Sequence, residues 1–117
     1  MDSNHRPPGK TTVSPDVLIA IARMASLNVE GVSRMAPVSG GVNRFFRRGI
    51  NDGVQIRISE NTLAADIYLV VEEGINIREV GRNVQQQVAR AIQEMVGMVV
   101  AHIDIHIEDI QYEATEA

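Results

Sequence analysis

The 117-residue sequence contains no cysteine and no tryptophan, and it has only two phenylalanines and two tyrosines. Without cysteine it has neither a disulfide framework, a thiolate zinc site nor a cysteine nucleophile. Its longest apolar runs, such as residues 17–22, are far shorter than the roughly 18 residues of a membrane-spanning helix, and the first ten residues lack the apolar core of a signal peptide. We therefore expect a cytoplasmic protein that meets a membrane only at its surface or through a partner.

Lysine occurs once, at Lys10, and the formal net charge is -4. The charge is unevenly divided, because residues 1–57 hold eight basic and four acidic side chains, whereas residues 58–117 hold three basic and eleven acidic ones. Duplex nucleic acids are bound chiefly through fields of Lys and Arg. This distribution argues against a general nucleic-acid binder and leaves room only for a small basic patch.

Hydrophobic residues make up 44% of the chain and charged residues 22%, which is typical of one soluble globular domain. We expect a single domain over residues 10–112, a flexible arm over residues 1–9 and an acidic tail over residues 113–117. Residues 10–13, "KTTV", have the composition of a short edge strand, although a disordered segment is the simpler interpretation.

Two amphipathic helices are predicted. The first begins with Ser14 as a cap and Pro15 at the first helical position. Its apolar face comprises Val17, Leu18, Ile21, Met24, Ala25 and Leu27, with Arg23 and Ser26 outside. The second helix starts at Asn76 and Glu79, which have capping-box spacing, and ends at Gly97 in a left-handed cap. Its apolar residues recur at helical intervals: Ile77, Val80, Val84, Val88, Ala91, Ile92 and Met95.

Alternating apolar and polar residues predict strands near 54–59, 62–72 and 99–110, with a shorter one after Gly31. A tight hairpin joins the first two, and Asn61 is the turn residue best suited to a positive φ. On residues 62–72 the inward set is Leu63, Ala65, Ile67, Leu69 and Val71. The opposite face is unusually apolar, and with the last strand it forms an outward strip of Ala64, Tyr68, Val70 and Val100.

The order strand, helix, strand at the end of the chain implies a right-handed crossover between parallel strands, whereas the hairpin supplies an antiparallel pair. The predicted fold is therefore α+β: a two-layer sandwich with two helices on one face of a small mixed sheet of four or five strands. The other face of the sheet is left open.

Chemical motifs are sparse. His102, Asp104 and His106 project from one strand face and are weak candidates for a metal site. Residues two apart on a strand lie about 6.5–7 Å from each other, so all three do not reach one ion without help, and a polar sheet face is the favoured interpretation. No serine elbow and no P-loop occurs. We therefore predict no catalytic residue, no resident metal and no cofactor.

The stretch "NRFFRRG", residues 43–49, holds both phenylalanines beside three arginines. Either the rings anchor a long loop on the core while the arginines stay solvated, or the segment is an exposed patch that grips carboxylates or lipid phosphates. Stacking of single-stranded nucleic acid is a third possibility. We take Arg44, Phe45, Phe46, Arg47 and Arg48, together with the outward strip, as the candidate partner-binding surface.

Much of the chain resembles the alkaline shock protein, or Gls-type envelope stress response, family. The resemblance is carried by "VSPDVLIAIARMASLNVEGVSRM", "GVQIRI", "LAADIYLVVEEGINIREVGRNVQQQVARAIQEMVG" and "VVAHIDIHIEDI". It implies a non-enzymatic protein held near the membrane by a membrane-anchored partner and linked to cell-envelope homeostasis; some relatives are associated with fatty-acid metabolism. We expect a self-associating cytoplasmic adaptor or scaffold. The alternatives are a nucleic-acid-binding module that uses the basic loop, a metabolic regulator, and, third, a metal protein.

Overall fold

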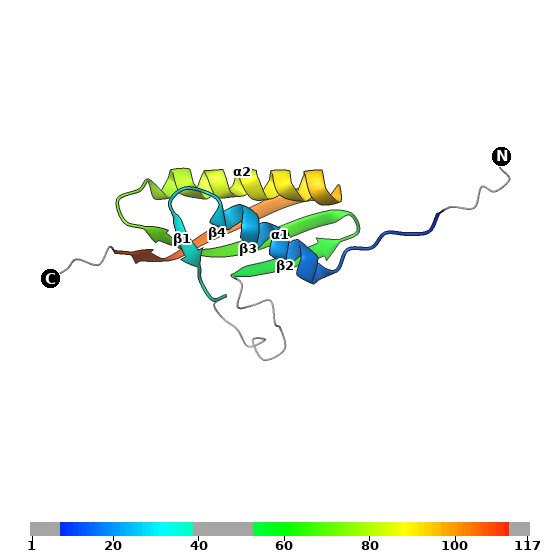
Figure 1. Cartoon of the computed structure of the whole chain (residues 1–117), viewed down its shortest axis with the longest axis horizontal. Helices are drawn as coiled ribbons and strands as arrows, with labels where there is room; N and C mark the ends of the chain where they lie inside the picture. The colour runs from blue at the N-terminus through cyan, green and yellow to red at the C-terminus, as the bar shows by residue number, and fades with distance from the viewer. Residues whose placement is uncertain (1–7, 39–52, 113–117) are drawn as a thin grey trace.

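The computed structural model describes residues 8–38 and 53–112. The elements follow one another as α1 (Pro15–Leu27), β1 (Val32–Met35), β2 (Val54–Ser59), β3 (Thr62–Glu72), α2 (Ile77–Val96) and β4 (Val99–Gln111). Figure 1 shows an elongated domain in which the strands lie in one layer and the helices in another. The predicted α+β class is confirmed.

β3 is the central strand of the sheet. Along one side it pairs in parallel with β4 over its whole length. Along the other side it pairs antiparallel with two strands placed end to end, because Val32–Met35 lie opposite residues 71–69 and Val54–Ser59 lie opposite residues 67–62. The sheet is therefore mixed and four-stranded, as predicted, with the two short strands sharing one edge of β3.

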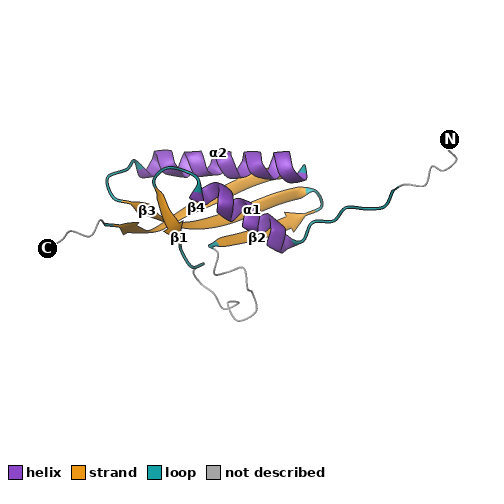
Figure 2. Cartoon of the chain, viewed as in Figure 1, coloured by secondary structure: helices purple, strands orange, loops and turns teal. Residues whose placement is uncertain are grey.

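Both helices cover the same face of this sheet (Figure 2). α2 packs along β4, α1 lies over β1 and β2, and the two helices contact each other. The core forms between the layers, and its largest fully buried side chains come mainly from β3, with Leu18 of α1 and Ile92 of α2. All five residues predicted to point inward from β3 are buried, and α2 contributes a row spaced by four residues: Val80, Val84, Val88 and Ile92.

The predicted ends of α2 are confirmed. The Asn76 side chain accepts a hydrogen bond from the Glu79 amide at 3.1 Å. Gly97 takes a φ of 81° and its amide donates to the carbonyls of Ile92 and Gln93, which would otherwise lack partners.

α1 differs from its prediction in its buried face. Ser14 occupies the N-cap position, but its hydroxyl makes no capping bond. Ser26, expected to face outward, is fully buried, whereas Met24 is 58% exposed. The helix rests on Leu18, Ala22 and Ser26, and the Ser26 hydroxyl donates to the Ala22 carbonyl at 2.8 Å. That local bond satisfies the hydroxyl, so a serine can occupy a core position.

Residues 10–13 do not form the edge strand that is the alternative interpretation of this segment; they are exposed, and they extend away from the sheet before α1 begins (Figure 1). One further expectation is wrong. In the hairpin between β2 and β3, Glu60 rather than Asn61 takes the positive φ, of 57°. A two-residue turn with a positive φ only at its first loop position follows the II′ pattern, so the position in the turn, not the residue's preference, decides which backbone is inverted.

Replacing Glu60 by glycine is expected to raise the free energy of unfolding by about 0.5–1 kcal/mol. A side chain in this conformation costs about 1–2 kcal/mol, part of which is offset by the greater entropy of glycine in the unfolded chain. Urea unfolding measures the gain. Glu60→Ala keeps the inverted backbone and should give none, so an equal gain in both variants would assign the effect to the lost charge.

Candidate functional site

The helices leave one face of the sheet uncovered, which we call the open sheet face. Strand register identifies its residues, since partners directly opposite each other share a face. Ala64 lies between Arg57 and His102, and Tyr68 lies beside His106. The open sheet face thus comprises Gln55, Arg57, Ala64, Asp66, Tyr68, Val70, His102, Asp104, His106 and Asp109.

Asp66 is the centre of a charged cluster on this face. Its Oδ2 accepts a bond from Arg57 Nη1 at 2.5 Å, and its Oδ1 lies 2.9 Å from His106 Nε2. The Asp66 side chain is only 15% exposed. Partial burial acts to raise the pKa of Asp66, but the hydrogen bonds from His106 and Arg57, with their charges, hold it below its ordinary value. The carboxylate is engaged on both oxygens and is a structural link between β2, β3 and β4.

Tyr68 extends this cluster along the open sheet face. Its ring stacks on His106 with centroids 4.5 Å apart and planes 14° from parallel. Burial, with the negative charges of Asp66 and Glu108, raises the pKa of Tyr68. The result is a preorganised surface with one aromatic platform and a fixed set of charges. Such a surface suits the binding of a partner, because Asp66 and His106 are already hydrogen-bonded to each other and keep their positions.

The weak metal candidates do not converge. His106 turns toward Asp66 and Tyr68, while His102 Nε2 lies 4.0 Å from Asp104 Oδ2 at the exposed end of the row. Across residues 8–38 and 53–112, no three His, Asp or Glu side chains are grouped in a way that could hold a metal ion.

The predicted outward strip is only partly correct. Ala64 and Tyr68 point outward and are partly exposed. Val70 is on the same face but only 4% exposed, and the Arg34 guanidinium crosses β3 beside it to donate to Gln111 Oε1. Val70 therefore offers little contact area.

The outward placement of Val100 is wrong. Val100 pairs with the inward residue Leu63, whereas His102 pairs with Ala64, so β4 contains an extra residue between them. This β-bulge turns Val100 toward the helices, where it packs against the core. Simple alternation does not reveal such a bulge. The other predicted contact residues, Arg44–Arg48, lie outside the described residues.

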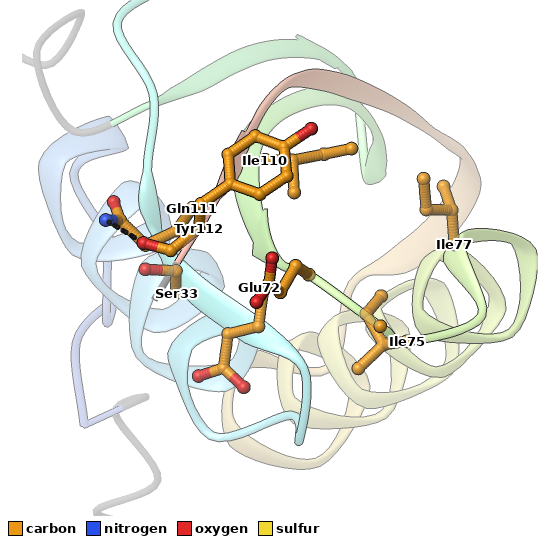
Figure 3. Close-up of a pocket in the computed structure, with 9 residues that line it drawn as sticks. Ser33, Glu72, Ile75, Ile77, Ile110, Gln111 and Tyr112 are labelled. Atoms are coloured by element: carbon orange, nitrogen blue, oxygen red, sulfur yellow. Dashed lines mark hydrogen bonds between the residues drawn. The ribbon is translucent and has the colours of Figure 1, made fainter. Parts of the chain in front are cut away.

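Sequence reasoning missed an open pocket of about 810 Å³ at the end of the sheet (Figure 3). Residues from β1, the turn between β3 and α2, and the end of β4 line it. Ile110 and Tyr112 lie on one side, and Ile75 and Ile77 stand apart from them in Figure 3. The Gln111 side-chain amide donates to the Tyr112 carbonyl at 3.4 Å, and the Glu73 amide donates to the Gln111 carbonyl at 3.2 Å, which ties the end of β4 to the turn after β3.

A smaller hollow of about 360 Å³ lies between α1 and α2. Met24 and Met95 flank it and are 58% and 69% exposed, although helical spacing placed both on core-facing stripes. In the part of the chain that the structure describes, no helix is long and apolar enough to cross a membrane.

Comparison with known proteins assigns the family. The model of the alkaline shock protein 23 family, described as having a cell envelope-related function, matches residues 3–112. The uncharacterized protein YqhY of Bacillus subtilis is 30% identical over 115 residues, covering 97% of this chain and 85% of YqhY. The uncharacterized protein Spy1535 of Streptococcus pyogenes is 30% identical over 108 residues, covering 92% of this chain and 83% of its own.

Among solved structures, a MamM CTD variant in its zinc form aligns with a TM-score of 0.55 at 12% identity, over 85% of this chain and 86% of that one. At that identity the likeness concerns the fold alone. The family match extends over both helices and all four strands described above. The chain is therefore a member of the alkaline shock protein 23 family, whose function is related to the cell envelope.

Proposed function

We propose that this protein is a non-catalytic adaptor of the cell envelope that associates with itself and binds a membrane-anchored protein partner from the cytoplasm. The family's envelope-related function supports the setting. The open sheet face supports the mode of action, because it carries an aromatic platform and fixed charges that nothing else in residues 8–38 and 53–112 covers.

The open sheet face is the single observation on which the partner-binding role depends. Aromatic and arginine side chains are enriched where proteins bind tightly, and Tyr68 and Arg57 are both held in place by neighbours before any partner arrives. Ala64, whose side chain is a single methyl group, lies between Arg57 and His102. A partner that presents an apolar side chain flanked by a carboxylate would fit this surface.

Nucleic-acid binding is less well supported. Arg57 is already paired with Asp66, and the adjacent strand adds Asp104 and Asp109 to the same face. These carboxylates repel phosphates. A mobility shift at low salt that disappears as salt rises would restore this alternative.

Changing Ala64 to glutamate is expected to abolish most partner capture while leaving the fold intact. The longer side chain would stand over the contact surface, and Arg57 and His102 on either side accommodate its charge. The measurement is quantitative recovery of membrane proteins with the tagged chain after cross-linking in cells, with thermal melts to verify folding. Gln86→Glu, on the exposed surface of α2, is the matched control.

Equal capture by the folded Ala64→Glu variant would remove the open sheet face from the proposal. Phe45→Ser with Phe46→Ser tests the other predicted contact residues, 44–48, in the same assay. If only that variant loses capture, the partner binds residues 44–48 and not the open sheet face.

A further inference from the structure

β4 is an edge strand with a long unpaired side. It pairs with β3 along one side, and no other strand in residues 8–38 and 53–112 adjoins it. The Ile103 carbonyl accepts a bond from Gln85 Nε2 at 2.9 Å, so it points out of the ladder. Alternate residues of a strand direct their backbone groups to the same side. Ile103, Ile105 and Ile107 therefore present N–H and C=O groups to a new strand.

We propose that β4 binds β4 of a second copy of this chain, antiparallel, about a two-fold axis at Ile105. This arrangement joins the two sheets into one. Residues whose numbers sum to 210 then lie opposite each other on the same face. Asp104 meets the second copy's His106, His102 meets the second copy's Glu108, and each pair occurs twice.

The sequence of the segment supports this partner. Residues 102–108 read "HIDIHIE", and when the segment is reversed each carboxylate stands opposite an imidazole. Glu108 lies close enough to the open sheet face for its charge to raise the pKa of Tyr68. The charge pattern of the free edge is thus complementary to itself.

Other registers are disfavoured. A slip of two residues one way puts Asp104 opposite its own copy and His102 opposite His106. A slip the other way puts Asp104 opposite Glu108 and His106 opposite its own copy. Both bring like groups together, which is destabilising on neighbouring strands. A slip of one residue exchanges the two faces of the strand. Only the register centred on Ile105 places every carboxylate of residues 102–108 opposite an imidazole.

The apolar side of β4 supports the same register. Ile105 and Ile107 face the helix layer and pack against the core, yet both stay partly exposed because β4 is at the edge. Pairing would put Ile105 against its own copy and Ile103 against Ile107, burying these side chains. Register shifts at Leu63/Ala64 and Leu69/Val70 leave β4 regular over residues 102–107, and Glu108 stands at the β-bulge that ends this segment. The pairing of His102 with Glu108 therefore lies at the two ends of the proposed interface.

Gln85 does not prevent the pairing. A carbonyl oxygen has two lone pairs, so the Ile103 oxygen can accept both the Gln85 amide and a backbone N–H of the second copy. The other edge groups, those of Ile105 and Ile107, receive no side-chain bond in the described residues.

The proposal deepens the self-association proposed above and does not depend on the adaptor role. Its test exchanges charges at an exposed pair, His102 and Glu108. His102→Glu places two carboxylates opposite each other at both ends of the pairing, and Glu108→Lys removes the carboxylate that faces the His102 imidazole, so each variant should weaken dimerisation by about tenfold or more. The combined variant, which restores opposite charges, should dimerise about as strongly as the unchanged chain. Sedimentation equilibrium of the whole chain measures all four constants.

A wild-type chain that remains monomeric at hundreds of micromolar would overturn this inference and the proposed self-association together. Self-association that is indifferent to the three variants would overturn this inference alone. Loss in the single variants without recovery in the double variant would also count against the stated register.

Engineered disulfides give a second, independent test, since the chain has no cysteine of its own. His102→Cys with Glu108→Cys should form an interchain disulfide on mild oxidation, because six residues along one strand separate the two sites by about 20 Å within a chain. Asp104→Cys with Glu108→Cys suits only the slipped register and should cross-link far less. Equal cross-linking by both pairs, or by neither, would overturn the proposal.

Discussion

Substitution of Gly53 by alanine is expected to lower the free energy of unfolding by about 2–5 kcal/mol, the sum of an inverted backbone and an overpacked contact. Gly53 has a φ of 74°, and a Cβ there would lie 2.7 Å from the Ala36 carbonyl oxygen and 2.9 Å from that of Tyr68. Both are backbone atoms, so no side chain can move aside.

These contacts exist because two strands share one edge of β3. The Ala36 amide donates to the Tyr68 carbonyl at 2.8 Å, and the Tyr68 amide donates to the Gly53 carbonyl at 2.8 Å. Gly53 is thus the point at which the chain re-enters the sheet directly beside the end of β1. Added bulk would push β1 and β2 apart and disturb Tyr68 on the open sheet face.

Gly74→Ala is the matched control for Gly53→Ala. Gly74 also has a positive φ, of 83°, but a Cβ there meets nothing within 4 Å. It should cost only the backbone term, about 1–2 kcal/mol. Urea unfolding of both variants separates the two effects. Equal losses would mean that the close approach at Gly53 relaxes freely.

Asp66→Asn is expected to cost about 1.5–3 kcal/mol, the usual range for hydrogen bonds to a charged group. The asparagine amide keeps the shape of the carboxylate but loses its charge. Its NH₂ group is a donor and would face the donor of Arg57 or His106, so one hydrogen bond is lost. Because these bonds hold the open sheet face in place, the Tyr68–His106 stack should loosen as well, and the tyrosine resonances in NMR spectra would report it.

The same variant should change the dependence of stability on pH. The pKa of Asp66 is lower in the folded protein than its ordinary value of 3.8. The stability contributed by the carboxylate is therefore complete above pH 3.8, and it is lost as the pH falls through the pKa of Asp66 in the folded protein. The wild-type chain should lose stability steeply below about pH 4, whereas Asp66→Asn should show a shallower slope there.

Glu94→Gln serves as the control for charge removal. Glu94 pairs with Arg90 on α2, and both side chains are about two-thirds exposed, so this change should alter stability by less than about 1 kcal/mol at any pH. If Asp66→Asn changes the free energy of unfolding as little as Glu94→Gln does, the cluster around Asp66 contributes little to stability.

Much of this fold is encoded locally. The cap at Asn76, the left-handed Gly97 and the alternation in β3 depend on neighbours within a few residues, and each is present as predicted. The layer architecture followed from which stripes were apolar. Which side chains are buried depends on the spacing of apolar residues along each element more than on their exact partners. The periodicity of the sequence was therefore sufficient to predict the layers.

The site depended on information that no local pattern contains. Asp66 and His106 are forty residues apart in sequence, and their contact exists only because the register of β3 against β4 places Tyr68 beside His106. A bulge turned Val100 inward, and a local hydrogen bond made Ser26 a core residue.

Periodicity by itself determined the helices, the strands and the layer to which each apolar stripe belongs, because these follow from side-chain spacing. Only the tertiary structure decided which charges meet and which edge stays free, because strand register and bulges arise from pairing between distant segments.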